Sequence, residues 1–131
     1  VWHGDQLSIK EIEDVLSKHP NAYYGLEIIG EGSELGIFPL FVGKNKQAYL
    51  DAINKKFDDL SRYDVRTWKP VIERHPDQIV WGTDRADAEW NYDIDVGQIM
   101  VRYTRAFIGK LDPEVQEKFA YKNAERLINE R

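Results

Sequence analysis

The stretch VIERHPDQIVWGTDRAD, residues 71–87, decides the fold prediction. A helix ends at His75–Asp77, where the proline cannot continue the backbone hydrogen bonds. Ile79–Trp81 is a short apolar run, typical of a strand that is covered on both faces. The strand stops at Gly82–Asp84, which places a carboxylate at its carboxyl end. From the residues alone, this carboxylate is either a turn former or part of a functional site.

The same order of elements occurs earlier in the chain. VLSKHPNAYYG, residues 15–25, aligns without a gap to VIERHPDQIVW, residues 71–81, at an offset of 56. Each copy is a helix end, a His-Pro-Asn/Asp turn and a strand. Two copies of this unit predict repeated βα architecture with parallel strands and right-handed crossovers.

The periodicity of apolar residues predicts the other elements. Val1-Trp2 is predicted to be the tail of a strand. A capping box at Ser8–Glu11 starts a helix over about 8–18, and residues 23–29 form the second strand. The glycine-containing stretch 30–43 is a long loop. Further helices are predicted over 49–60, from a cap at Thr67 with Pro70 in the first turn, along 99–107, from Asp112-Pro113, and from a cap at Asn123 to about Asn129.

Composition limits the class of protein. With 131 residues, 42% hydrophobic and 31% charged, the chain is one domain over residues 1–131. Neither the 23 acidic nor the 18 basic residues form a long block, so no nucleic-acid partner is expected. No apolar run reaches the roughly 20 residues that span a membrane. The lack of cysteine excludes disulfides and thiolate metal sites and fits the cytoplasm.

Two motifs resemble a known family. IERHPDQIVWGTDRAD, followed by a helical stretch and AYKNAERLI, looks like the C-terminal part of the amidohydrolase superfamily. The most similar branch contains metal-dependent hydrolases and nonoxidative decarboxylases, which are (β/α)8 barrels. Their last strand ends in Gly-Ser/Thr-Asp, and their closing helix begins Asn-Ala-x-Arg-Leu, matched here by residues 123–127. The resemblance implies the α/β class, as the C-terminal portion of a TIM barrel with about the last three βα units, parallel strands and helices.

The resemblance also implies a metal site. In the family a divalent ion, usually zinc, lies at the carboxyl mouth of the barrel. Asp84 matches the aspartate that ends the eighth strand, so it is implied as a metal ligand and catalytic base. His3 matches the catalytic histidine that ends the sixth strand. The His-x-His pair and the fifth-strand histidine have no counterpart, so the 131-residue chain alone is predicted to be inactive.

The alternation of side chains along a strand agrees with this role for Asp84. Val80, Gly82 and Asp84 point one way, while Trp81 and Thr83 point the other. If Trp81 packs under the helices, Asp84 faces the inner side of the sheet. Two further histidines, His19 and His75, lie in turns at the opposite end of the strands, where the helix dipole favours them as structural residues.

Two residues are candidates for substrate binding. Glu27 lies at the carboxyl end of its strand and could orient a ligand or substrate, although pairing with an arginine is the alternative. Arg85 follows the other strand and could hold a substrate carboxylate, although an ordinary solvated loop is the alternative.

Two functions from different classes remain. The first is a segment of a metal-dependent hydrolase, in which activated water attacks an amide, ester or lactone, or of a nonoxidative decarboxylase; both take a small-molecule substrate. The second is a non-catalytic α/β fragment or interaction module that lacks the metal centre. Because the strands of His3 and Asp84 would each lack a neighbour, we expect contact with another copy or with the missing N-terminal part of the barrel.

Overall fold

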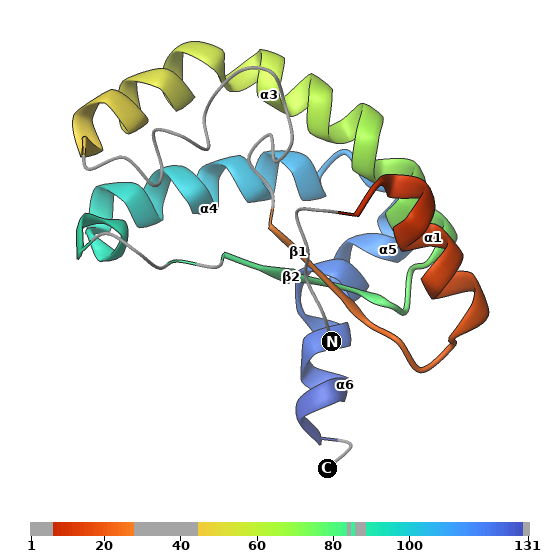
Figure 1. The fold of residues 1–131 in the computed structure, drawn as a ribbon. Helices are drawn as coiled ribbons and strands as arrows, with labels where there is room; N and C mark the ends of the chain where they lie inside the picture. Colours follow the sequence, from red (N-terminus) through yellow and green to blue (C-terminus); the bar gives the residue numbers. More distant parts are fainter. Residues whose placement is uncertain (1–6, 28–44, 84, 86–88, 130–131) are drawn as a thin grey trace.

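The computed structural model describes residues 7–27, 45–83, 85 and 89–129 (Figure 1). His3, Asp84, the predicted strand tail Val1-Trp2 and the predicted loop over 30–43 therefore lie outside the described residues. The elements in chain order are α1 (Ile9–Lys18), β1 (Tyr24–Glu27), α3 (Lys46–Arg74), β2 (Ile79–Gly82), the 3-10 helix η1 (Glu89–Tyr92), α4 (Ile94–Ile108), α5 (Pro113–Glu117), the π-helical turn η2 (Lys118–Lys122) and α6 (Asn123–Asn129). In the described part of the chain, no helix combines the length and the apolar composition needed to cross a bilayer.

The two strands pair in parallel, as predicted, but the barrel prediction is wrong. β1 and β2 run side by side from the pair Tyr24 and Ile79 to the pair Glu27 and Gly82. The described chain is otherwise mostly helical and has only these two short strands, so it is not a portion of a TIM barrel with three βα units. The physical reason is periodicity: most buried apolar residues recur at helical spacing, and only two runs of four residues form strands.

The repeated helix-turn-strand unit is confirmed. In each copy, the histidine N–H donates to the carbonyl of the valine four residues earlier, at 3.0 Å for both His19 and His75. The N–H three residues after each histidine donates back to the histidine carbonyl, at 2.9 Å in the first copy and 3.0 Å in the second. The two histidines end α1 and α3, as the structural interpretation predicted.

Gln78 joins the two copies. Its backbone carbonyl accepts from the Tyr24 N–H at 2.8 Å. Its side-chain Nε2 lies 3.0 Å from the carbonyl oxygens of Leu16 and His19 and 3.1 Å from that of Ala22. One amide of the second turn thus satisfies carbonyls at the end of α1, which fixes that helix against the start of the sheet.

The helix α1 forms as predicted, whereas the two helices predicted between residues 49 and 74 are one. Ser8 and Glu11 make both bonds of the capping box before α1. The helix α3 runs unbroken through Thr67 and Pro70. Although proline removes one helical hydrogen bond, the buried residues Leu60 and Trp68 lie on one face of a continuous helix. Their packing outweighs the local signal for a break.

At the C-terminal end, the predictions are partly correct. The stripe along residues 99–107 lies in α4, with Ile99, Met100, Tyr103 and Phe107 buried. Asp112 precedes α5 and Pro113 is its first residue, as predicted. The predicted cap at Asn123 is wrong, because η2 continues directly into α6 and Asn123 has helical backbone angles (φ −66°, ψ −42°).

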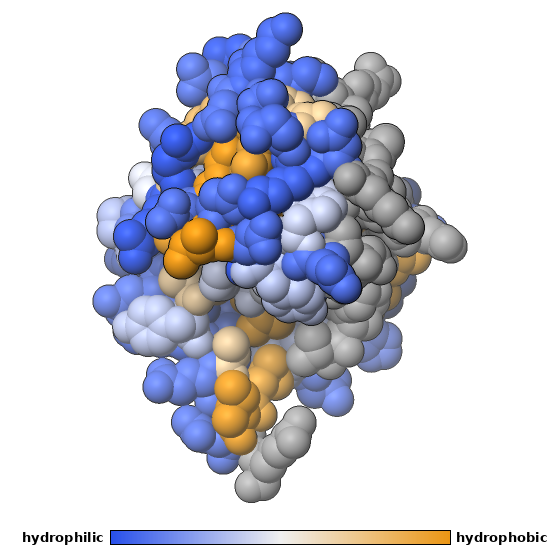
Figure 2. Space-filling view, turned by 90° about the vertical axis from the view of Figure 1, so that its left-hand side faces the viewer, coloured by the Kyte–Doolittle hydropathy of each residue, from blue (hydrophilic) through white to orange (hydrophobic). Residues whose placement is uncertain are grey.

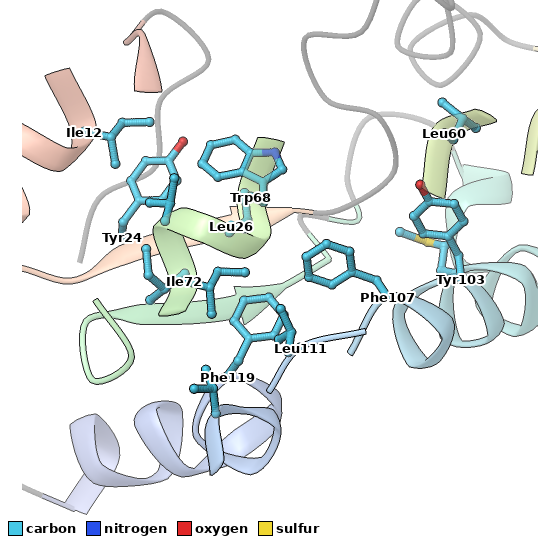
Figure 3. Packing of buried hydrophobic residues seen from close by; sticks show 14 of the residues in the cluster. Ile12, Tyr24, Leu26, Leu60, Trp68, Ile72, Tyr103, Phe107, Leu111 and Phe119 are labelled. Carbon is cyan, nitrogen blue, oxygen red and sulfur yellow. The ribbon is translucent and has the colours of Figure 1, made fainter. Parts of the chain in front are cut away.

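The core lies between the strands and the long helices. Figure 3 shows Trp68 and Ile72 of α3 near Tyr24 and Leu26 of β1, with Phe119 of η2 below the strands. The rings of Tyr24 and Trp68 stack with centroids 6.0 Å apart. In Figure 1, α3 and α4 run along the upper side of the molecule and α6 projects from the lower side. Both strands therefore lie between helices. Because the strands are parallel, their carboxyl ends lie side by side at one edge of the sheet.

Candidate functional site

The carboxyl ends of the two strands meet at one edge of the sheet. Glu27 ends β1, is half-buried and is paired in register with Gly82, which ends β2. A Cβ atom placed on Gly82 would meet no described atom within 4 Å, so the space beside it is open among the described residues. Gly82 is followed by Thr83 and then by the position of Asp84. Two of the predicted site residues, Glu27 and Arg85, therefore lie at or beside the same edge.

Ile79 belongs to the main hydrophobic cluster and Trp81 packs against it. Val80 is also buried, so burial alone does not separate the two faces of β2. By the alternation along a strand, Val80 and Gly82 point to the face opposite Trp81. The prediction that the Asp84 carboxylate shares that face, and that His3 lies on the same rim, concerns residues outside the described ranges. His19 and His75 precede β1 and β2, so they lie at the opposite edge.

Arg85 contacts the turn that begins α4. Its Nε donates to the carbonyl of Asn91, and its Nη2 donates to the carbonyl of Asp93 at 3.2 Å. Its own carbonyl accepts from the Tyr92 hydroxyl at 2.7 Å. The guanidinium carbon also lies 5.6 Å from the centroid of the Tyr92 ring. The sequence suggested a substrate carboxylate as the partner of Arg85, and these backbone contacts were not predicted.

A second group of polar residues holds the start of α4 against α3. Lys46 Nζ lies 2.6 Å from Asp93 Oδ2 and 2.8 Å from Asp95 Oδ2. These contacts raise the pKa of Lys46, and the same lysine lowers the pKa of Asp95. The rings of Tyr49 and Trp90 lie 5.3 Å apart, and burial raises the pKa of Tyr49 to about 12. The sequence signal that could have predicted the contact of Trp90 with Tyr49 is the presence of two aromatic residues, Trp90 and Tyr92, within the polar stretch 85–95.

The surface around this end of α4 is mostly hydrophilic. Figure 2 views the molecule from the side on which α4 begins, and its apolar areas are small and separated by hydrophilic residues. The large apolar side chains that are exposed among the described residues are Leu7, Tyr92, Ile94, Val101, Tyr121 and Ile128. Ile94 and Val101 both belong to α4, and the other four come from four different parts of the described chain.

One buried polar pair lies away from this edge. The Tyr103 hydroxyl donates to Asp64 Oδ2 at 2.7 Å between α4 and α3, and Asp64 is 0% exposed. Burial, followed by the Asp64 charge, raises the pKa of Tyr103. Asp64 was missed in the sequence although it lies four residues from both Leu60 and Trp68 on the buried stripe. An acidic residue at that spacing is the signal that could have found it.

The described residues do not form a metal centre by themselves. Within the ranges that the structure covers, no group of three or more His, Asp or Glu residues could hold a metal ion. A catalytic zinc site typically has three protein ligands. Glu27 is the one predicted site residue with a carboxylate at the edge in these ranges, since Asp84 lies outside them. Within the described ranges, Glu27 is therefore the one residue at this edge that could contribute to the zinc site that the resemblance implies; Asp84, the ligand that the resemblance names, lies outside them.

The two motifs that carry the family resemblance contact one another. Asn123 Nδ2 donates to the carbonyls of Pro76 and Ile79, at 2.8 Å each, and Asn123 is 2% exposed. Arg126 donates to the carbonyl of Asp77 and lies 3.7 Å from its carboxylate. The polar residues of the closing helix therefore bind the turn and the start of the strand that leads to position 84.

Comparisons of the chain with models of known protein families, with curated proteins and with solved structures gave no match. The resemblance to the amidohydrolase superfamily therefore stays a prediction from the two motifs. What the contacts add is the spatial relation between those motifs and the edge of the sheet.

Proposed function

We propose that this chain is part of a metal-dependent hydrolase or nonoxidative decarboxylase that acts on a small-molecule substrate. The observation that carries the proposal is the contact between the two motifs, made by Asn123 with Pro76 and Ile79. Residues more than forty positions apart in the sequence come together because Asn123 donates to the turn and strand before Gly82–Asp84. This is the arrangement expected if the closing helix supports a strand that ends in a functional residue.

The roles we propose for Asp84 and His3 come from the family resemblance. Asp84 is the metal ligand and the base, and His3 assists it. Glu27, across from Gly82 in the register, orients a ligand or substrate. A bound divalent ion, which we expect to be zinc, supplies a Lewis acid that polarises the substrate or lowers the pKa of water. The protein's own part is to hold the carboxylates and to leave space beside Gly82.

The surroundings of the site fit this reaction class. Among the described residues, the space that a side chain on Gly82 would occupy is open, and a glycine there allows a substrate to approach the backbone at the end of β2. The parallel pairing brings the carboxyl ends of both strands to the same edge, where ligands of parallel α/β sheets commonly bind. The lack of cysteine favours a reducing compartment, and we propose the cytoplasm.

The test uses the protein encoded by the whole natural gene. It is purified, treated with a chelator and assayed on ester, amide and lactone substrates and for release of CO2 from carboxylic acids. Activity that is lost on chelation and restored by zinc is the expected result. Activity that survives with no metal in the protein, or the lack of any turnover at full zinc occupancy, would contradict the proposal and favour a non-catalytic module. The 131-residue chain by itself serves as the inactive control.

A further inference from the structure

Arg85 joins the end of β2 to the start of α4 through both its side chain and its backbone. The guanidinium donates to the carbonyls of Asn91 and Asp93, and the Arg85 carbonyl accepts from the Tyr92 hydroxyl. These three contacts run from Arg85 to three consecutive residues, so they fix the position and orientation of Arg85 relative to Asn91–Asp93. The carbonyl of Asp93 also accepts from the Gly97 N–H at 3.0 Å, so the guanidinium is tied into the first turn of α4.

The helix provides a place for this side chain. A Cβ atom on Gly97 would lie 3.1 Å from Arg85 Nη1, closer than ordinary van der Waals contact. The guanidinium therefore packs against the backbone of α4 at a position where the lack of a side chain gives it room. The Arg85 guanidinium therefore contacts Gly97 and the carbonyls of Asn91 and Asp93, which are all groups of this chain.

We propose that Arg85 is a positioning residue that ties its own position, just after β2, to Asn91–Asp93 at the start of α4, with the Tyr92 hydroxyl as its partner. This inference rests on the proposed function, in which Asp84, its neighbour in the chain, carries the chemistry. A guanidinium that donates to two backbone carbonyls is fixed relative to both, because two directed, charge-assisted bonds define its position and orientation. The role differs from that of a substrate-binding arginine, whose donors face the ligand.

The first experiment measures hydrogen exchange at the start of α4, which does not depend on catalytic activity. Hydrogen exchange is followed at the amides of Asp93 and Gly97, which donate to the carbonyls of Trp90 and Asp93. Arg85→Lys is expected to speed this exchange by roughly tenfold or more, because it removes hydrogen bonds from a charged group. Tyr92→Phe is expected to speed it by roughly threefold to tenfold, because the bond it removes joins two neutral groups. Tyr92 is 68% exposed, so loss of its hydroxyl does not threaten the fold.

Matched controls separate this effect from a general loss of stability. Arg62→Lys changes an exposed arginine that pairs with Asp59 on α3, and Tyr121→Phe changes a tyrosine that is 49% exposed. Neither control should alter exchange at Asp93 or Gly97. Unchanged exchange in both Arg85→Lys and Tyr92→Phe overturns the proposal.

The second experiment compares kcat with KM in the protein encoded by the whole gene. A positioning role predicts that Arg85→Lys lowers kcat about tenfold and leaves KM within about twofold, because substrate binding is unaffected. A raised KM with unchanged kcat would assign Arg85 to the substrate and overturn the proposal. If the wild-type protein has no activity at full zinc occupancy, the proposed function fails, and the exchange rates decide the positioning role without it.

Discussion

Asn123→Ala removes the amide that ties the closing helix to β2. The side chain is 2% exposed, and its Nδ2 donates to two carbonyls at 2.8 Å. The bond to the Ile79 carbonyl is buried, and the bond to the Pro76 carbonyl is only partly buried. The substitution shortens the side chain and adds no new group, so the lost bonds dominate its effect.

The two bonds differ in energy because of their burial. Loss of the partner of a buried carbonyl costs about 1–3 kcal/mol, whereas the partly buried carbonyl can bond to water and its loss costs about 1 kcal/mol. We therefore expect Asn123→Ala to lower the free energy of unfolding by about 2–4 kcal/mol. For a chain of this size that corresponds to a drop in Tm of roughly 10 °C.

The assay is urea unfolding followed by circular dichroism, with Asn129→Ala as the matched control. Asn129 is an exposed asparagine on the same helix, and its substitution is expected to change the free energy by less than about 0.5 kcal/mol. A loss below about 1 kcal/mol for Asn123→Ala, at an unchanged slope m, would refute the role given to this amide.

The isosteric variant Asn123→Asp adds a test with pH. A carboxylate there faces two carbonyl oxygens and cannot donate, so its folded-state pKa is raised above the unfolded value. Stability is then highest below the unfolded pKa of about 3.9 and is lost as the pH rises through the folded pKa. Wild-type protein lacks this dependence, and the difference between the two pH profiles isolates it.

Three further outcomes follow from the contacts. Burial raises the pKa of Tyr49 to about 12. The protein should therefore lose stability as the pH rises from the unfolded pKa of about 10 through the folded pKa. Tyr49→Phe should reduce this loss, which is checked by measuring phenolate absorbance and unfolding in the same samples. Pro70→Ala should stabilise the protein by about 1–2 kcal/mol in thermal unfolding, since Pro70 is exposed inside α3 and the new N–H completes the helix; a destabilisation would show that the proline has a packing role. Gly97→Ala should raise Tm through helix propensity and yet speed exchange at Asp93, because Arg85 Nη1 must move; slower exchange would contradict the contact.

Local signals in the sequence were sufficient where backbone hydrogen bonding decides the structure. The two His-Pro turns, the capping box before α1 and the parallel strands were all predicted, because each depends on a few neighbouring residues. The break expected at Thr67 failed, since buried residues along α3 pack as one continuous helix. Asn123 failed as a cap because its amide binds carbonyls that are distant in the sequence.

In the candidate site too, features set by local sequence were predicted and features set by distant contacts were not. The repeat predicted that the strands of Glu27 and Gly82 run in parallel, but it did not predict that these two residues pair in register. The contacts of Arg85 could not be predicted, because they require the turn at Asn91–Asp93 to fold back onto the end of β2. The barrel prediction extended a likeness in two motifs to a whole architecture, and the described chain has two strands and mostly helices instead.

The most direct test of the proposed function is turnover of the Asp84→Asn variant of the protein encoded by the whole gene, with zinc content measured in the same samples. Asparagine keeps the shape of the side chain and removes its charge and basicity, so we predict a loss in kcat of about a hundredfold or more with the fold intact. Asp58→Asn, an exposed aspartate on α3, should leave turnover unchanged. Wild-type turnover by Asp84→Asn at full zinc occupancy would contradict the catalytic role of Asp84.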